Sequence, residues 1–172
     1  MIRFIPQLVL LVLLVGCGGK DNIATPAKLE DLAIELPTSR IWKQNSGVGS
    51  GNHFLQLNAF ITENNIYTVD SKGKISAFNK DTGKELWSRS LEQPISAGLN
   101  GGEGILVAGN FDGVLTAVSA ESGEQLWQSE LSSEIMSVSS VNSGRLVART
   151  NDGQLYGIDA ENGEQAWLYA YT

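Results

Sequence analysis

The sequence predicts an all-β protein that folds as a β-propeller of four-stranded blades. Three segments align without gaps at a spacing of 40 residues, and each carries two glycines and a tryptophan at the same places. The repeated positions are Gly73, Gly113 and Gly153; Gly83, Gly123 and Gly163; and Trp87, Trp127 and Trp167. The 19 glycines are spread between short apolar runs, which predicts many tight turns between strands. A period near 40 residues in such a sequence is typical of propeller blades.

The first 16 residues have the pattern of a signal peptide. Arg3 supplies a positive charge, and an almost unbroken apolar run follows from Ile5 to Val15. This run is shorter than the roughly 20 residues that a membrane-spanning helix needs, so it fits the apolar region of an export signal. It ends in Leu14-Val15-Gly16-Cys17, which resembles the lipobox of bacterial lipoproteins. The resemblance implies cleavage before Cys17, lipidation of its thiol and anchoring in a membrane. The other interpretation is an ordinary secretory signal with an incidental cysteine.

Residues 17–37 are expected to form a tether, because they are polar at first, contain Pro26 and Pro37 and show no strand alternation. Gly18 follows Cys17, where an aspartate favours the inner membrane in lipoproteins of this kind. The resemblance therefore implies the outer membrane, with the protein facing the periplasm. Loss of Arg3 with the signal leaves 11 basic and 19 acidic side chains, a net charge of -8. An acidic surface repels phosphate backbones, so nucleic acid is not an expected partner.

Residues 38–172 contain the repeats, and each repeat divides into the same strands. In the second copy the strand-forming runs are Ser96–Asn100, Ile105–Asn110, Val114–Ser119 and Gln125–Leu131. The corresponding runs of the other copies are Ile66–Val69, Ile75–Phe78, Leu146–Ala148 and Leu155–Ile158. An Asp-Gly turn at Asp112 joins the second and third runs of the middle copy. Because side chains alternate along a strand, Leu126 and Trp127 are expected to face opposite ways.

The residue types predict no catalytic, cofactor or metal site. Cys17 is the only cysteine and His53 the only histidine, so there is no cluster with metal-ligand spacing and no Ser/His/Asp set. Aspartates at or beside turns are expected to bond local backbone groups; they are Asp70, Asp81, Asp112, Asp152 and Asp159. The tryptophans recur once per blade, which favours packing between neighbouring blades over stacking on a cofactor, since a cofactor needs a single site.

The segments NKDTGKELW, SAESGEQLW and DAENGEQAW resemble the tryptophan motif of the PQQ-like β-propeller repeat. The usual form of that motif has an alanine, an aspartate two residues on, then Thr-Gly and a tryptophan four residues after the glycine. Ala77 and Ala117 fit the first place and Gly157 departs from it, while Thr82 is the only threonine before the motif glycine. The motif is specific for the fold and says little about chemistry.

The segment from Ile41 to Trp87 is similar to the opening of one family. It combines a strand at Trp42, a loop at Val48–Gly51 with the order Gly-Ser-Gly, and then the first full blade. It resembles the BamB family of outer-membrane assembly lipoproteins. The resemblance implies an eight-bladed periplasmic propeller, with Trp42 on a strand that closes the ring by joining the last blade. It further implies a non-enzymatic scaffold without a cofactor. Such a scaffold binds the central barrel-inserting subunit of the β-barrel assembly machine and assists insertion of β-barrels into the outer membrane.

Eight blades of this length need roughly 320 residues, and this chain contains about three blades. The sequence is therefore expected to be the N-terminal part of a longer protein. Two other functions remain open. A fragment of a quinoprotein (PQQ-dependent) dehydrogenase would share the repeat, but such enzymes need calcium, a catalytic aspartate and a cofactor pocket, which nothing in the sequence indicates. A lipoprotein propeller that binds another ligand or peptidoglycan is the third interpretation.

Overall fold

The computed structural model describes residues 26–29, 38–52 and 54–170. The chain divides into two compact units, 1–38 and 39–172. The described residues of the first unit, 26–29 and Thr38, form neither helix nor strand. The expected signal peptide lies outside the described residues, as do Cys17 and most of the expected tether. Within the described ranges, no helix is long and apolar enough to cross a membrane.

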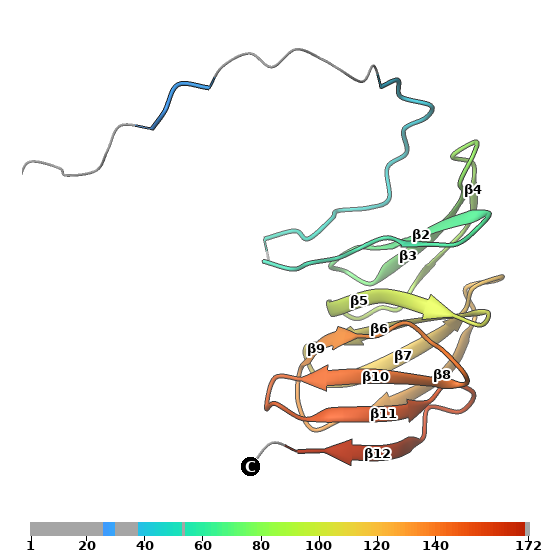
Figure 1. Ribbon diagram of the computed structural model, residues 1–172. Coiled ribbons are helices and arrows are strands. Elements are labelled where there is room, and N and C mark those ends of the chain that lie inside the picture. Colours follow the sequence, from blue (N-terminus) through green and yellow to red (C-terminus); the bar gives the residue numbers. More distant parts are fainter. Residues whose placement is uncertain (1–25, 30–37, 53, 171–172) are drawn as a thin grey trace, which may run out of the picture. The chain divides into compact units, whose positions relative to one another are not determined.

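The second unit contains three four-stranded antiparallel sheets, which follow one another in chain order from green to red in Figure 1. Blade 1 contains β1 (Phe60–Ile61), β2 (Asn65–Val69), β3 (Lys74–Asn79) and β4 (Glu85–Ser90). Blade 2 contains β5 (Ile95–Gly102), β6 (Ile105–Asn110), β7 (Val114–Ser119) and β8 (Gln125–Glu130). Blade 3 contains β9 (Ile135–Val138), β10 (Arg145–Thr150), β11 (Leu155–Asp159) and β12 (Gln165–Tyr169). The all-β class and the four-stranded repeat expected from the sequence are confirmed.

The turn between the third and fourth strands is built the same way in every blade. Its glycine has a positive φ of 69° at Gly83, 73° at Gly123 and 78° at Gly163. Each of these glycines donates its backbone N–H to the carbonyl four residues earlier, at 2.8 to 2.9 Å. A left-handed conformation costs a residue with a Cβ about 1–2 kcal/mol, and glycine at this place in the turn avoids that cost.

The fourth strand of each blade carries a bulge just before its tryptophan. In blade 2, Ala117 pairs with Trp127 and Val118 pairs with Gln125, so Leu126 has no partner in the register. The same skip occurs in blades 1 and 3. A bulge re-aims the side chains of the strand that contains it. Here the alternation expected for a regular strand does not hold, because Leu126 lines a pocket that includes Ala160 and the indole of Trp127 bonds the Ala160 carbonyl.

Two apolar cores fill the spaces between the blades. Leu106 and Val118 of blade 2 pack with blade 1, in a core that also contains Ile75 and Ile95. Leu115 and its neighbours on the other face pack with blade 3, in a core that contains Trp127, Ile135, Leu146 and Ile158. Blade 2 therefore buries both of its faces, because successive side chains of a strand point to opposite sides of the sheet. A single blade has no such second layer, and for this reason the repeats stabilise one another.

Candidate functional site

Two tryptophans of the repeat, Trp87 and Trp127, lie in sockets on the following blade. The indole N–H of Trp87 donates to the carbonyl of Ala120 at 3.1 Å, and that of Trp127 donates to the carbonyl of Ala160 at 2.9 Å. The floor of each socket is the motif glycine of that blade. A Cβ at Gly123 would lie 2.7 Å from the Trp87 ring, and one at Gly163 would lie 2.6 Å from the Trp127 ring. The glycine thus serves both the turn and the close approach of the indole.

Trp42 occupies the equivalent socket on blade 1. Its indole N–H donates to the carbonyl of Lys80 at 2.8 Å, and a Cβ at Gly83 would lie 2.6 Å from its ring. The sequence spacing does not reveal this equivalence, because Trp42 stands 45 residues before Trp87 rather than 40. Trp42 therefore contacts blade 1 as the motif tryptophan of a preceding blade would.

Trp167 differs from the other three tryptophans. It has no socket within the described residues, and 45% of its surface is exposed, against 8% for Trp127. Its ring lies over Gly157, the residue that it faces on β11, and a Cβ at that glycine would overlap the indole. In blades 1 and 2 this place belongs to Ala77 and Ala117. The departure from alanine noted in the sequence thus coincides with a tryptophan that folds back on its own sheet.

Asp70 holds the loop at residues 46–52 against blade 1. One carboxylate oxygen accepts the backbone N–H groups of Lys72 and Lys74 at 3.0 and 2.9 Å, which closes the turn after β2. The other oxygen accepts the backbone N–H of Val48 at 3.1 Å. The N–H of Ser71 in turn donates to the carbonyl of Gly49 at 2.8 Å. A turn role was expected for Asp70, but its bond to Val48 has no signal in the sequence.

Asn110 takes the place of Asp70 in blade 2 and bonds a different kind of group. The Asn110 amide oxygen accepts the N–H groups of Asp112 and Val114 at 3.0 and 2.7 Å, as Asp70 does in its own turn. Its amide NH₂ donates to the side-chain oxygen of Gln93 at 2.9 Å. A carboxylate can only accept, whereas an amide also donates. The residue type at this place therefore follows the polarity of the group that the adjacent segment presents.

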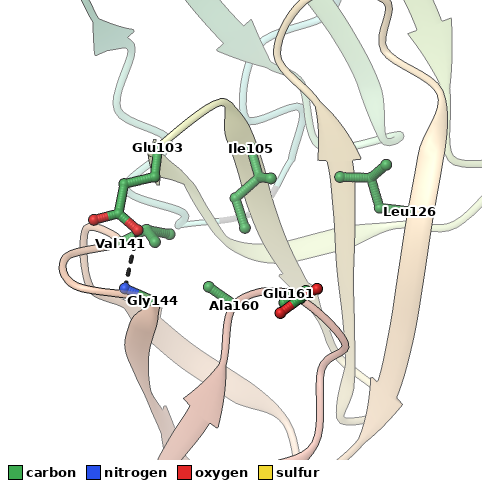
Figure 2. A pocket seen from close by; sticks show the side chains of 7 residues that line it. All are labelled: Glu103, Ile105, Leu126, Val141, Gly144, Ala160 and Glu161. Atoms are coloured by element: carbon green, nitrogen blue, oxygen red, sulfur yellow. Dashed lines mark hydrogen bonds between the residues drawn. The ribbon is translucent and has the colours of Figure 1, made fainter.

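A pocket of about 440 Å³ opens between blades 2 and 3 (Figure 2). Its apolar walls are Ile105, Leu126, Val141 and Ala160, and Glu103 and Glu161 stand at its rim. These residues come from five different turns and strands of two blades, so no local sequence pattern brings them together. The repeat gives a partial signal for two of these residues, because Leu126 and Glu161 have the same residue types as Leu86 and Glu121, which stand 40 residues earlier.

The two glutamates at this pocket differ in their partners. Glu103 has a positive φ of 52°, and its carboxylate accepts the backbone N–H groups of Ser143 and Gly144 at 2.7 and 2.9 Å. Glu103 thereby ties the turn of blade 2 to that of blade 3. The side chain of Glu161 has no bonding partner in the described part of the chain. Its backbone N–H, together with the nearby guanidinium of Arg145, holds the pKa of Asp159 below its ordinary value.

Groups suited to catalysis or metal binding do not converge in the described residues. No three His, Cys, Asp or Glu side chains among them are placed to hold a metal ion. His53 and Cys17 lie outside the described ranges. Asp152 accepts the hydroxyls of Ser132 and Thr150, and these bonds lower its pKa. Asp159 likewise accepts the N–H of Glu161 at 2.9 Å. The expected local bonds are not found for Asp81 and Asp112, whose side chains have no hydrogen-bond partner among the described residues.

Comparison with known proteins identifies relatives over most of the chain. A family profile described as "Outer membrane protein assembly factor BamB" matches residues 32–96 and 71–171. The protein of that name from Pseudomonas aeruginosa is 31% identical to this chain, over 59% of this chain and 27% of the relative. The protein of that name in Escherichia coli K12 is 29% identical over 52% of this chain and 24% of the relative. The chain thus matches about a quarter of the length of these relatives.

Solved structures contain the same blades. BamB from Moraxella catarrhalis superposes with a TM-score of 0.61 and 22% identity, over 67% of this chain and 35% of that one. A computationally designed protein, Ika4, superposes with a TM-score of 0.59 and 19% identity, over 74% of this chain and 80% of that one. At these identities the likeness shows the fold alone, and it confirms blades of the PQQ-like propeller type. Because the family profile spans far more than half of the sequence, the chain belongs to the family of the outer membrane protein assembly factor BamB.

Proposed function

We propose that the chain is a non-enzymatic scaffold of the outer-membrane β-barrel assembly machine and assists the insertion of β-barrel proteins. Membership of the BamB family carries this proposal, because the relatives are named outer membrane protein assembly factors. The proposed partner is the central barrel-inserting subunit of that machine. The proposed role needs a rigid framework with accessible loops and no reactive centre.

The blade geometry supports a scaffold role. Three tryptophans pack against the next blade, and each donates its indole N–H to a carbonyl of that blade; they are Trp42, Trp87 and Trp127. The conspicuous side chains of the repeat are therefore committed to packing. The turns remain on the surface, and loops carried by a rigid scaffold are where binding residues concentrate.

A lipid anchor at Cys17 would place this scaffold at its site of action. The segment Leu14–Cys17 fits the lipobox pattern, and Gly18 favours the outer membrane. Several acyl chains anchor a protein firmly, because each buried CH₂ contributes about 0.8 kcal/mol. The anchored propeller would then face the periplasm, with residues 17–37 as its tether.

Affinity purification from crosslinked cell envelopes tests the proposed partner. We expect the tagged chain to recover the central barrel-inserting subunit above the level of a tagged, unrelated outer-membrane lipoprotein. Recovery of peptidoglycan or other envelope proteins without that subunit would contradict the proposal. Alcohol oxidation by the purified chain in the presence of pyrroloquinoline quinone and calcium would instead favour the dehydrogenase alternative.

A further inference from the structure

The pocket between blades 2 and 3 combines an apolar interior with an acidic rim. Four apolar side chains line it, and the side chain of Leu126 is 51% exposed there. A leucine left half in water beside a hollow still has apolar surface that a partner could cover. Figure 2 shows Glu103 on one side of the hollow and Glu161 on the other.

The negative charge extends along the whole end of these two blades. The turns between first and second strands and between third and fourth strands lie at the same end of each sheet, because the strands are antiparallel. In blades 2 and 3 these turns expose five glutamates, which are Glu103, Glu121, Glu124, Glu161 and Glu164. These turns contain no lysine or arginine, and Arg145 at the start of β10 is paired with Asp159. In the corresponding turns of blade 1, Lys80 and Lys84 balance the charges of Glu63 and Asp81, so the excess of acidic groups is confined to blades 2 and 3.

The ligand that fits this surface is a cation with an apolar stem. Both oxygens of Glu103 are held by backbone N–H groups, whereas the Glu161 side chain has no partner among the described residues. A guanidinium can bond a carboxylate through two parallel N–H groups. Its methylene stem can lie along Ile105 and Leu126, as long basic side chains do on apolar surfaces.

We infer that this end of blades 2 and 3 is a docking surface for a basic, leucine-bearing peptide segment of a partner protein. An arginine of that segment pairs with Glu161, and its stem and the adjacent leucine cover the apolar pocket. The other glutamates of the rim attract the segment and orient it. This inference is independent of the proposed assembly role, because it rests only on the pocket and the charges around it.

The junction between blades 1 and 2 provides a matched control within the same chain. Glu121 and Leu86 stand there at the places of Glu161 and Leu126. The places of Ile105 and Val141 are taken by Asn65 and Gly101, so the apolar interior is not repeated. Arg89 also packs against Gly123 there, whereas Ser129 takes its place at the junction of blades 2 and 3. Attraction by the glutamates alone would still extend to Glu121, whereas the inferred docking surface uses only the junction of blades 2 and 3.

Fluorescence anisotropy with the full chain and a labelled hexapeptide of alternating leucine and arginine tests the inference. We expect saturable binding that Glu161→Gln and Leu126→Ser each weaken about five-fold or more, as central interface contacts do. The control variants Glu121→Gln and Leu86→Ser should leave the affinity within about two-fold, because they lie outside the pocket. Unchanged melting temperatures would show that all four variants remain folded.

Three results would overturn the inference. One is the absence of saturable binding to the wild-type chain. Another is an equal loss of affinity in the two control variants, which would indicate attraction by acidic charge alone. The third is equal binding of a hexapeptide in which glutamate replaces arginine. In the supporting case, the backbone amides of Gly144 and Glu161 should also show the largest NMR shift changes when the arginine peptide is added.

Discussion

Trp127 is the residue on which the packing of blades 2 and 3 depends most visibly. It is buried in their shared core, its N–H is bonded to the Ala160 carbonyl, and its ring lies against Gly163. Each of these contacts crosses from one blade to the next. The tryptophan and the glycine of neighbouring blades are therefore two halves of one contact, although 36 residues separate them in sequence.

We expect Trp127→Ala to destabilise the chain by about 3–5 kcal/mol, the usual cost of removing a buried tryptophan. Trp167→Ala should cost much less, since Trp167 is about half exposed and its ring lies over Gly157 of its own sheet. Urea unfolding followed by circular dichroism measures both changes. A larger loss for Trp167→Ala than for Trp127→Ala would contradict this order of the contacts.

The glycine half of the contact can be tested in the same way. Gly123→Ala should destabilise by roughly 2–4 kcal/mol, because the methyl group adds overlap with Trp87 and Arg89 to the strain of a positive φ. Gly153→Ala is the control, because Gly153 has a φ of 85° but no atom within 4 Å of an added Cβ. It should cost only about 1–2 kcal/mol of backbone strain. Equal losses in thermal unfolding would show that the socket is not tightly packed.

At the scale of elements, the segment before β1 is held to blade 1 by few contacts. Trp42 lies in the blade 1 socket, and Asp70 binds the N–H of Val48. This segment has no strand pairing of its own between residues 39 and 52. Its attachment therefore depends on individual side chains, and loss of one bond should loosen it locally.

Asp70→Asn tests this attachment. The remaining amide oxygen can keep the bonds to Lys72 and Lys74, but the NH₂ group then faces the Val48 N–H, so two donors meet. Asp70 is buried, so leaving the NH₂ group of the introduced asparagine unpaired costs about 1–3 kcal/mol. We expect faster hydrogen exchange at Val48 and faster tryptic cleavage after Lys43. Asp112→Asn, at an exposed turn position of blade 2, should change neither rate, and unaltered rates in Asp70→Asn would refute the attachment.

The strands were largely predictable, because their apolar runs alternate and their turns carry glycine. The run Ile105–Asn110 and the run Val114–Ser119 coincide with β6 and β7. The bulge at Leu126 was not predictable, since it follows from the register with β7 rather than from the composition of β8. The pocket was missed for a related reason: Ile105 and Val141 meet only when two blades pack, and packing between repeats leaves no local pattern.

For the whole molecule, the middle blade joins two cores that share no buried residue. One core lies between blades 1 and 2 and the other between blades 2 and 3. Stability in such an array is the sum of blade terms and nearest-neighbour contacts, so damage at one junction spreads through the middle blade. The function proposed for the chain depends on this rigidity, because loops can recognise a partner only when the blades fix their positions.

The location proposed for the molecule would depend on one group, the Cys17 thiol. Cys17→Ser should abolish incorporation of labelled fatty acid, because a hydroxyl replaces the thiol that would accept the lipid. The chain should then appear in the soluble periplasmic fraction or remain unprocessed. Gly18→Asp is a second variant that retains the thiol; it should keep the label and shift the protein toward the inner membrane. Equal labelling of wild type and Cys17→Ser would refute the lipidation.

Isothermal titration of the full chain against the purified periplasmic region of the central assembly subunit measures most directly whether the folded array of blades binds that subunit. We expect saturable binding by the wild-type chain. Trp127→Ala, which removes a contact at the junction of blades 2 and 3, should weaken this binding, while Trp167→Ala should leave it nearly unchanged. A well-folded wild-type chain that does not bind saturably, or an unchanged affinity in Trp127→Ala, would contradict the proposed role.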